Sequence, residues 1–461
     1  MEKLFDFLET KVATPAAKLG EQRHLQALRN GVVSAIPFII VGSFFLIIAF
    51  PPVPESWAIA KWASAHVDQI LIPYRLTFFI MSLYIGFGIG YNLAKSYDLD
   101  PLVGGQLSVA ALLLSIMPVK QGDDWFLPMA SLGSVGIFPS MLLAVFAVEV
   151  LRFCKSRNLM FKLPEQVPSS VARSFESIIP AAIVILVMTL INVVLKINLE
   201  KVIQAIFSPF VAAGDTYFGV LAPVLLITIL WMFGIHGDSI VDTIAEPIWL
   251  QFFNQNAEAV ANHQHPTHIA PEPFFQWFIW IGGSGATIGL IICALIFGRA
   301  KYTRSISRAS VVPSIFNINE PVIFGFPIML NPIFFIPFIL APVVMTTVTW
   351  FSFKAGLVNL MYVQPPWTLP APIGAFLATG GDWRAIVLCL VNVAIATIIY
   401  FPFFQVYDRQ QLALEAEEEN ETLTPEEENL LTPNNSAEAT ATATAGDEAL
   451  DTKLEKTEPL S

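Results

Sequence analysis

The sequence predicts an all-α integral membrane protein with about ten transmembrane helices and two re-entrant hairpins in its C-terminal half. The first observation is composition, because 55% of the 461 residues are hydrophobic and only 13% are charged, whereas soluble domains carry about 25% charged residues. The second is a series of apolar runs of about 20 residues, the length that crosses a bilayer. The third is that the later runs are interrupted, and non-helical backbone at membrane depth is tolerated only where it is buried or lines a cavity.

Nine apolar runs predict the spans. They lie at residues 31–50, 72–94, 102–118, 132–153, 177–196, 216–233, 274–298, 326–350 and 384–405. The segments 234–273 and 309–325 are apolar but broken, and the stretch 240–254 is too short to span and contains Pro247. We therefore predict re-entrant hairpins there.

Basic residues predict the orientation, because short cytoplasmic loops carry an excess of lysine and arginine. They gather in the N-terminal stretch and in the loop after the fourth run, which places the N-terminus in the cytoplasm. A further cluster of basic residues indicates another cytoplasmic loop; it consists of Arg299, Lys301, Arg304 and Arg308. A strict count of spans does not easily place this loop on the cytoplasmic side.

These patterns divide the chain into five parts. They are an amphipathic N-terminal segment (1–30), an N-terminal transmembrane half (31–195), an amphipathic connector (196–215), a C-terminal transmembrane half (216–405) and an acidic tail (406–461). For the N-terminal segment, a soluble helix that caps the protein is an equally good interpretation. Residues 411–461 hold fourteen acids against two lysines, which accounts for the whole net charge of −12. Residues 1–410 carry no net charge, so no excess of basic residues favours binding of nucleic acid. The tail is predicted to be disordered and cytoplasmic.

His236 is the first candidate for chemistry. It follows an apolar run and lies between Gly234 and Gly237, which free the backbone to unwind and let a ligand approach closely. Ionisable groups inside a membrane are costly and are functional candidates by default. The alternative is a histidine that caps a helix end.

Glu320 is the second candidate, in the sequence Asn319-Glu320-Pro321. Its carboxylate has two acceptor oxygens for hydroxyl groups and, when ionised, can act as a general base. The alternative is a carboxylate at the start of a helix. Two other Glu-Pro pairs, Glu246-Pro247 and Glu272-Pro273, are assigned helix-start or loop roles.

Trp231 and Trp367 adjoin the broken segments, where their rings could stack on a sugar, although belt tryptophans at the membrane interface are the alternative. No metal site is predicted, because the cluster HQHPTH at residues 263–268 has no acid at ligand spacing, and the three cysteines are far apart. No phosphate-binding glycine loop of the Walker type is present, so ATP-driven pumping is not expected, and no cofactor is predicted.

Four motifs together resemble one family. They are GIHGD with His236, SIFNINEP with Glu320, YNLAKSY at 91–97 and QPPWTLPAPIGAFLATGGDW at 364–383. Over about residues 1–410 the chain resembles enzyme IIC, the membrane subunit of the bacterial phosphotransferase system (PTS), in its lactose, cellobiose and diacetylchitobiose branch.

The resemblance implies a homodimer in the bacterial inner membrane. Its N-terminal half would make the dimer contact, and its C-terminal half would hold a disaccharide, cellobiose by preference. The sugar would be phosphorylated during entry by phosphate from a cysteine of enzyme IIB, itself supplied by enzyme IIA. Glu320 would bind the 6-hydroxyl and act as base, and His236 would orient the sugar or steady the phosphate. Trp231, Gly234, Gly237, Asn319 and Trp367 would complete the sugar site. No folded domain follows residue 410, so IIA and IIB would be separate polypeptides.

Two alternatives stay open. An ion-coupled secondary transporter would use Glu320 or Asp242 as a proton relay. A structural membrane protein would bind no sugar.

Overall fold

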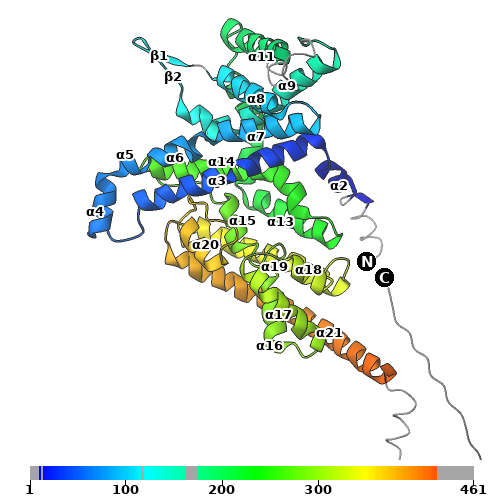
Figure 1. Ribbon diagram of the computed structural model, residues 1–461. Helices are drawn as coiled ribbons and strands as arrows, with labels where there is room; N and C mark the ends of the chain where they lie inside the picture. The colour runs from blue at the N-terminus through cyan, green and yellow to red at the C-terminus, as the bar shows by residue number, and fades with distance from the viewer. Residues whose placement is uncertain (1–9, 12–13, 117, 162–174, 423–461) are drawn as a thin grey trace, which may run out of the picture. The chain divides into compact units, whose positions relative to one another are not determined.

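The computed structural model describes residues 10–11, 14–116, 118–161 and 175–422, and most of that chain is helical, as predicted (Figure 1). The elements up to residue 156 are α2 (Thr14–Gly20), α3 (Arg23–Ala49), α4 (Ala58–Ala65), α5 (Val67–Ile70), α6 (Ile72–Leu76), η2 (Phe78–Ile80), α7 (Met81–Ser96), α8 (Pro101–Ser115), β1 (Val119–Gln121), β2 (Asp124–Phe126), η3 (Met129–Leu132), η4 (Ser134–Gly136) and α9 (Ile137–Ser156). The later elements are α11 (Ile178–Thr189), η5 (Leu190–Val194), α12 (Leu199–Gly214), α13 (Tyr217–Met232), α14 (Gly237–Ala261), α15 (Glu272–Phe278), α16 (Ile288–Phe297), α17 (Lys301–Ile315), α18 (Glu320–Gly325), α19 (Pro332–Lys354), α20 (Ala371–Ala378) and α21 (Trp383–Thr422).

Five described helical stretches are long and apolar enough to cross a membrane, or six when the pair α11–η5 and α12, bent by 87°, is taken as one span. The five are Arg23–Ala49, Val67–Ser96, Ser134–Ser156, Pro332–Lys354 and Trp383–Glu418. They match five predicted spans. The runs 102–118 and 216–233 form the shorter apolar helices α8 and α13, so the total of ten spans stays a prediction.

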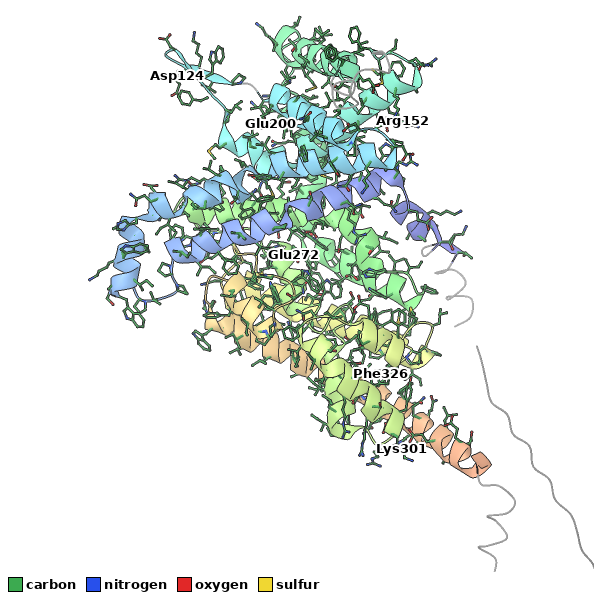
Figure 2. All side chains as sticks on the ribbon, viewed as in Figure 1. Asp124, Arg152, Glu200, Glu272, Lys301 and Phe326 are labelled. Carbon is green, nitrogen blue, oxygen red and sulfur yellow. The ribbon has the colours of Figure 1, made fainter. Side chains whose placement is uncertain are left out.

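The N-terminal helices pack closely because glycines lie between them. A Cβ on Gly31 of α3 would lie 2.5 Å from the backbone nitrogen of Ile89 of α7, and one on Gly104 of α8 would lie 2.5 Å from the carbonyl oxygen of Gly90 of α7. Small residues allow this approach between membrane helices. The tip of the β1–β2 hairpin, with Asp124, lies beyond this group (Figure 2).

The predicted span 274–298 is wrong. Instead of one helix, the structure has α15 and α16 separated by residues 279–287. In that connection Gly282, Gly283 and Gly285 have φ values of +81°, +95° and +85°. These are values that glycine adopts without steric penalty and that no helix contains. Hydropathy is high throughout the run, so it could not reveal the interruption.

The predicted break in 240–254 is also wrong, because α14 runs without interruption through Pro247. Side chains of α14 enter two hydrophobic clusters. Trp249 packs in the cluster of the C-terminal half, whereas Leu250 and Phe253 pack in the cluster of α3, α7 and α9. Burial on both sides stabilises the helix, and this outweighs the loss of the one backbone hydrogen bond that proline removes.

The break predicted in 309–325 is observed as the non-helical residues between α17 and α18. The connector predicted at 196–215 is the helix α12, where Ile203 is buried while Ile206 and Phe210 are exposed. The disorder predicted from residue 406 is wrong as far as Thr422, because α21 continues to that residue and includes the first acids of the tail. Most of the predicted amphipathic stretch 1–14 and all of residues 423–461 lie outside the described residues.

Candidate functional site

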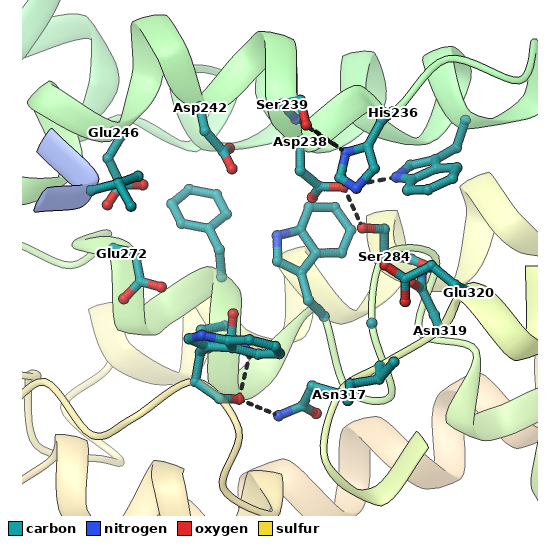
Figure 3. Close-up of a pocket in the computed structure, with 18 of the residues that line it drawn as sticks. His236, Asp238, Ser239, Asp242, Glu246, Glu272, Ser284, Asn317, Asn319 and Glu320 are labelled. Atoms are coloured by element: carbon teal, nitrogen blue, oxygen red, sulfur yellow. Dashed lines mark hydrogen bonds and ion pairs between the residues drawn. The ribbon is translucent and has the colours of Figure 1, made fainter. Parts of the chain in front are cut away.

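A cavity of about 690 Å³ lies among the broken helices of the C-terminal half and the start of α3. Its lining comes from α3, α13, α14, α15, the glycine-rich connection 279–287, the start of α18 and the segment around Trp367 (Figure 3). The volume is in the range of sites for small molecules. Five of the seven residues predicted for the site line this cavity: Trp231, His236, Asn319, Glu320 and Trp367.

The other two predicted residues, Gly234 and Gly237, do not line the cavity but shape the backbone beside it. Gly234 has φ +75° in the turn between α13 and α14. Gly237 begins α14, and a Cβ there would lie 2.3 Å from the carbonyl oxygen of Ile227. Both glycines therefore place His236, which lies between them.

His236 caps the start of α14 and also faces the cavity. Its Nδ1 accepts the backbone N–H of Ser239 at 3.3 Å and lies 2.9 Å from the Ser239 hydroxyl. The neutral ring that accepts through Nδ1 carries its proton on Nε2. The imidazole is half exposed and lies 4.5 Å from the Trp231 ring. The capping alternative is thus observed, and it leaves an Nε2–H donor for a ligand.

Asp238 fixes the orientation of Trp231. Its Oδ2 accepts the indole N–H at 2.7 Å and the hydroxyl of Ser284 at 2.6 Å. These bonds connect α13, α14 and the glycine-rich connection at one point. Asp238 was not among the predicted site residues, although its position two residues after His236 in an apolar segment was a usable signal.

Glu320 is the first residue of α18 and is exposed to the cavity. Among the described residues, no hydrogen bond or ion pair involves its carboxylate. The preceding Asn319 is buried and donates through Nδ2 to the carbonyl of Ser284 at 3.0 Å. The backbone before Glu320 is therefore held, and its carboxylate oxygens stay available to a ligand.

Asn317 holds three segments together beside Glu320. Its Oδ1 accepts the N–H of Gly282 at 3.1 Å, and its Nδ2 donates to the carbonyls of Trp367 and Leu369, both at 3.0 Å. It adopts φ +62°, which asparagine tolerates better than most residues. The sequence interpretation missed Asn317, because its role depends on segments that are distant along the chain.

A row of carboxylates runs from beside His236 towards the part of the cavity away from Glu320 (Figure 3). Asp238, Asp242 and Glu246 are spaced by four residues along α14 and so share one face of the helix. Glu272, at the start of α15, lies across the cavity from Asp242 and Glu246 (Figure 3). It accepts a hydrogen bond from Gln364. The helix-start role assigned to Glu272 is observed, but the one assigned to Glu246 is wrong, because Glu246 lies in the middle of α14.

Aromatic rings complete the lining. Trp249 stacks on Phe275 at 4.1 Å, and both line the cavity with Trp280 and the two predicted tryptophans. In the described part of the chain, no group of three or more His, Cys, Asp or Glu residues could hold a metal ion. Aromatic faces combined with carboxylates and amides suit a neutral ligand with many hydroxyl groups.

Comparisons with known proteins agree on one family. Residues 29–342 match the family model described as "Phosphotransferase system, EIIC". The chain is 38% identical to the cellobiose-specific EIIC component of the PTS of Geobacillus stearothermophilus, over 90% of this chain and 96% of that protein. It is 35% identical to the lichenan permease IIC component of Bacillus subtilis (strain 168), over 89% of this chain and 95% of that protein.

A solved structure has a similar fold. The crystal structure of ChbC, the IIC component from the N,N'-diacetylchitobiose-specific phosphotransferase system, matches with a TM-score of 0.83 and 37% identity, over 89% of this chain and 99% of that one. The predicted resemblance is confirmed: this chain belongs to the EIIC family of membrane-spanning PTS sugar permeases, in the branch of cellobiose, lactose and diacetylchitobiose components.

Proposed function

We propose that this permease binds a β-linked disaccharide, cellobiose by preference, and transports it while enzyme IIB phosphorylates its 6-hydroxyl. Diacetylchitobiose and lactose are the other candidate substrates. The observation that carries the proposal is a single cavity in which the Glu320 carboxylate, without a partner among the described residues, and a ring donor, His236, lie among aromatic rings. The relatives named for cellobiose and N,N'-diacetylchitobiose support this class of substrate.

Glu320 is the proposed general base. Its carboxylate takes the proton of the 6-hydroxyl as that oxygen bonds to phosphorus, and the phosphorus–sulfur bond to the IIB cysteine breaks in line, so that the cysteine leaves as thiolate. His236 donates from Nε2 to the sugar or to a phosphoryl oxygen. Asp238 takes no part in the transfer and instead holds Trp231 in position to stack on the sugar ring. The chain is then the membrane component of a protein-Nπ-phosphohistidine–sugar phosphotransferase.

The carboxylate row is proposed to bind the second sugar ring. Glu246 and Glu272 offer acceptor oxygens to hydroxyl groups at a part of the cavity apart from Glu320 (Figure 3). Carboxylates accept hydrogen bonds from hydroxyl groups, so Glu246 and Glu272 would favour disaccharides whose second ring places hydroxyl groups there.

The same proposal includes the finer architecture. It comprises about ten transmembrane helices with a re-entrant hairpin at residues 309–325, a cytoplasmic N-terminus and C-terminal tail, and a homodimer formed through residues 31–195. IIA and IIB act as separate polypeptides. Support comes from the similarity to the diacetylchitobiose component over 89% of the chain.

The test is a transfer assay with membranes that contain the full chain, phosphorylated IIB and labelled cellobiose. The wild type is expected to form cellobiose 6-phosphate. Glu320→Gln is expected to lower the rate by about 100-fold or more, the usual contribution of a general base, while still binding the sugar. The matched control Glu21→Gln alters an exposed glutamate outside the cavity and is expected to keep the normal rate.

A normal transfer rate in Glu320→Gln would show that Glu320 is not the base. Sugar uptake into liposomes that follows an imposed pH gradient without any phosphoprotein would instead establish the ion-coupled secondary transporter.

A further inference from the structure

A second polar pocket lies away from the sugar cavity, where α16, α17 and α21 meet. Its volume is about 330 Å³, and its charged lining residues are Arg299, Arg304, Asp408 and Arg409. None of these residues lines the larger cavity. The pocket therefore requires an explanation that the sugar site does not supply.

Asp408 bonds to backbone and forms no ion pair with the arginines among the described residues, so its one negative charge offsets only part of their positive charge. It is 4% exposed and accepts the N–H groups of Arg299 at 2.9 Å and Ala300 at 3.3 Å. These bonds hold the turn between α16 and α17 against α21. Arg304 donates from Nε to the carbonyl of Gly298 at 2.8 Å, which fixes its guanidinium at the same turn.

The guanidinium groups of Arg299, Arg304 and Arg409 are exposed and have no carboxylate within ion-pair distance in the described part of the chain. The pocket thus presents three positive charges around one carboxylate. Arginine is the side chain best suited to bind phosphate through paired hydrogen bonds. The chemistry favours an anion with acceptor oxygens, such as a phosphate ester.

An exposed apolar surface begins next to these arginines. At the end of α16, Ile296 is 66% and Phe297 47% exposed, and on α21 Ile398 is 72% and Val406 49% exposed. The two helices are neighbours, because the ring centroids of Phe297 and Phe401 are 4.8 Å apart. Lys301, labelled in Figure 2, is the first residue of α17 and follows the turn that contains Arg299.

We propose that this pocket binds the phosphodiester headgroup of an anionic phospholipid, whose acyl chains lie along the exposed apolar faces of α16 and α21. The apolar faces belong to helices that lie in the bilayer, α21 among them, so the headgroup of a phospholipid reaches the arginines while its acyl chains stay against these faces. A soluble phosphate or the carboxylates of an acidic peptide would use the charge alone. Basic groups at the ends of membrane helices attract anionic lipid by about 1 kcal/mol for each residue.

The experiment uses the full chain purified in detergent, with binding of phosphatidylglycerol or phosphatidylcholine measured by native mass spectrometry. The wild type is expected to bind phosphatidylglycerol more tightly. The double variant Arg299→Gln/Arg409→Gln is expected to bind it about 30-fold more weakly, the product of two such charge contributions. The double variant to lysine, which keeps both charges, is expected to retain most of the binding.

Arg308→Gln is the matched control, because Arg308 lies on α17 and is exposed but does not line the pocket. It is expected to bind phosphatidylglycerol like the wild type. Equal binding of the two lipids by the wild type, or unchanged phosphatidylglycerol binding by the double glutamine variant, would overturn the proposal. Complete displacement of the lipid by millimolar inorganic phosphate would also overturn it and indicate a site for a soluble anion.

Discussion

The two halves of the chain use glycine in opposite ways, and this difference explains where the cavity lies. In α7 and α8, Gly90 and Gly104 lie inside continuous helices and let them approach closely. In the C-terminal half, Gly283 and its neighbours have positive φ and interrupt the helix. Close packing fills the space between helices, whereas interrupted backbone leaves room for Ser284 and Asn319 at the cavity. Variants of single residues can test this contrast.

The largest effect is expected from Gly283→Ala. The position has φ +95°, and an added Cβ would lie 2.4 Å from the Cβ of Asn319, so the segment before Glu320 must move. A shift of about 1 Å in a positioned group can reduce function by about 100-fold, and we expect sugar binding to weaken by a similar factor. Equilibrium binding of labelled cellobiose to the purified protein measures it.

Gly356→Ala is the control for backbone strain alone, because Gly356 has φ +69° and no atom lies within 4 Å of its Cβ position. Its sugar affinity is expected to stay near that of the wild type. Equal affinities for the Gly283 variant and the wild type would show that the glycine connection does not position the site.

A smaller effect is expected from His236→Asn. Asparagine is a good N-cap residue, so α14 should begin normally, but the Nε2–H donor is lost. One hydrogen bond of about 1.4 kcal/mol corresponds to about a tenfold lower rate of phosphate transfer. The assay with phosphorylated IIB measures that rate, and the thermal midpoint checks the cap. An unchanged rate would leave His236 with its capping role only.

Glu246→Gln should change substrate preference more modestly. The amide oxygen still accepts from a hydroxyl group, so we expect the affinity for a disaccharide to fall about fivefold, which corresponds to one weakened hydrogen bond. The affinity for glucose, which cannot reach both ends of the cavity, should be the same in this variant as in the wild type. Glu258→Gln, on the same helix but outside the cavity, is the control. Equal losses for both sugars would contradict a role at the second ring.

The smallest effect on the site is expected from Gly104→Ala. The new Cβ would lie 2.5 Å from the carbonyl oxygen of Gly90, and overpacking of this kind destabilises a protein by about 1–3 kcal/mol. The thermal midpoint should therefore fall, while the folded fraction keeps its sugar affinity. A tenfold loss of affinity in folded protein would remove the distinction between the two halves.

The sequence by itself determined the class of the protein and several of its helices. Length and hydropathy were sufficient for α3, α9 and α21, because a continuous apolar run has few other stable conformations in a bilayer. Glycine and proline next to polar residues were sufficient to select His236 and Glu320 as candidates, since intramembrane ionisable groups are rare.

Only the tertiary structure decided which residues share the cavity. Glycines at positive φ and glycines between packed helices look alike in a sequence, so the run 274–298 was misassigned. Asn317 acts through carbonyls about 50 residues away. Pro247 was expected to end a helix that burial on two sides sustains. Hydropathy and residue type are local properties, whereas the direction of a side chain depends on contacts that form only when distant segments pack together.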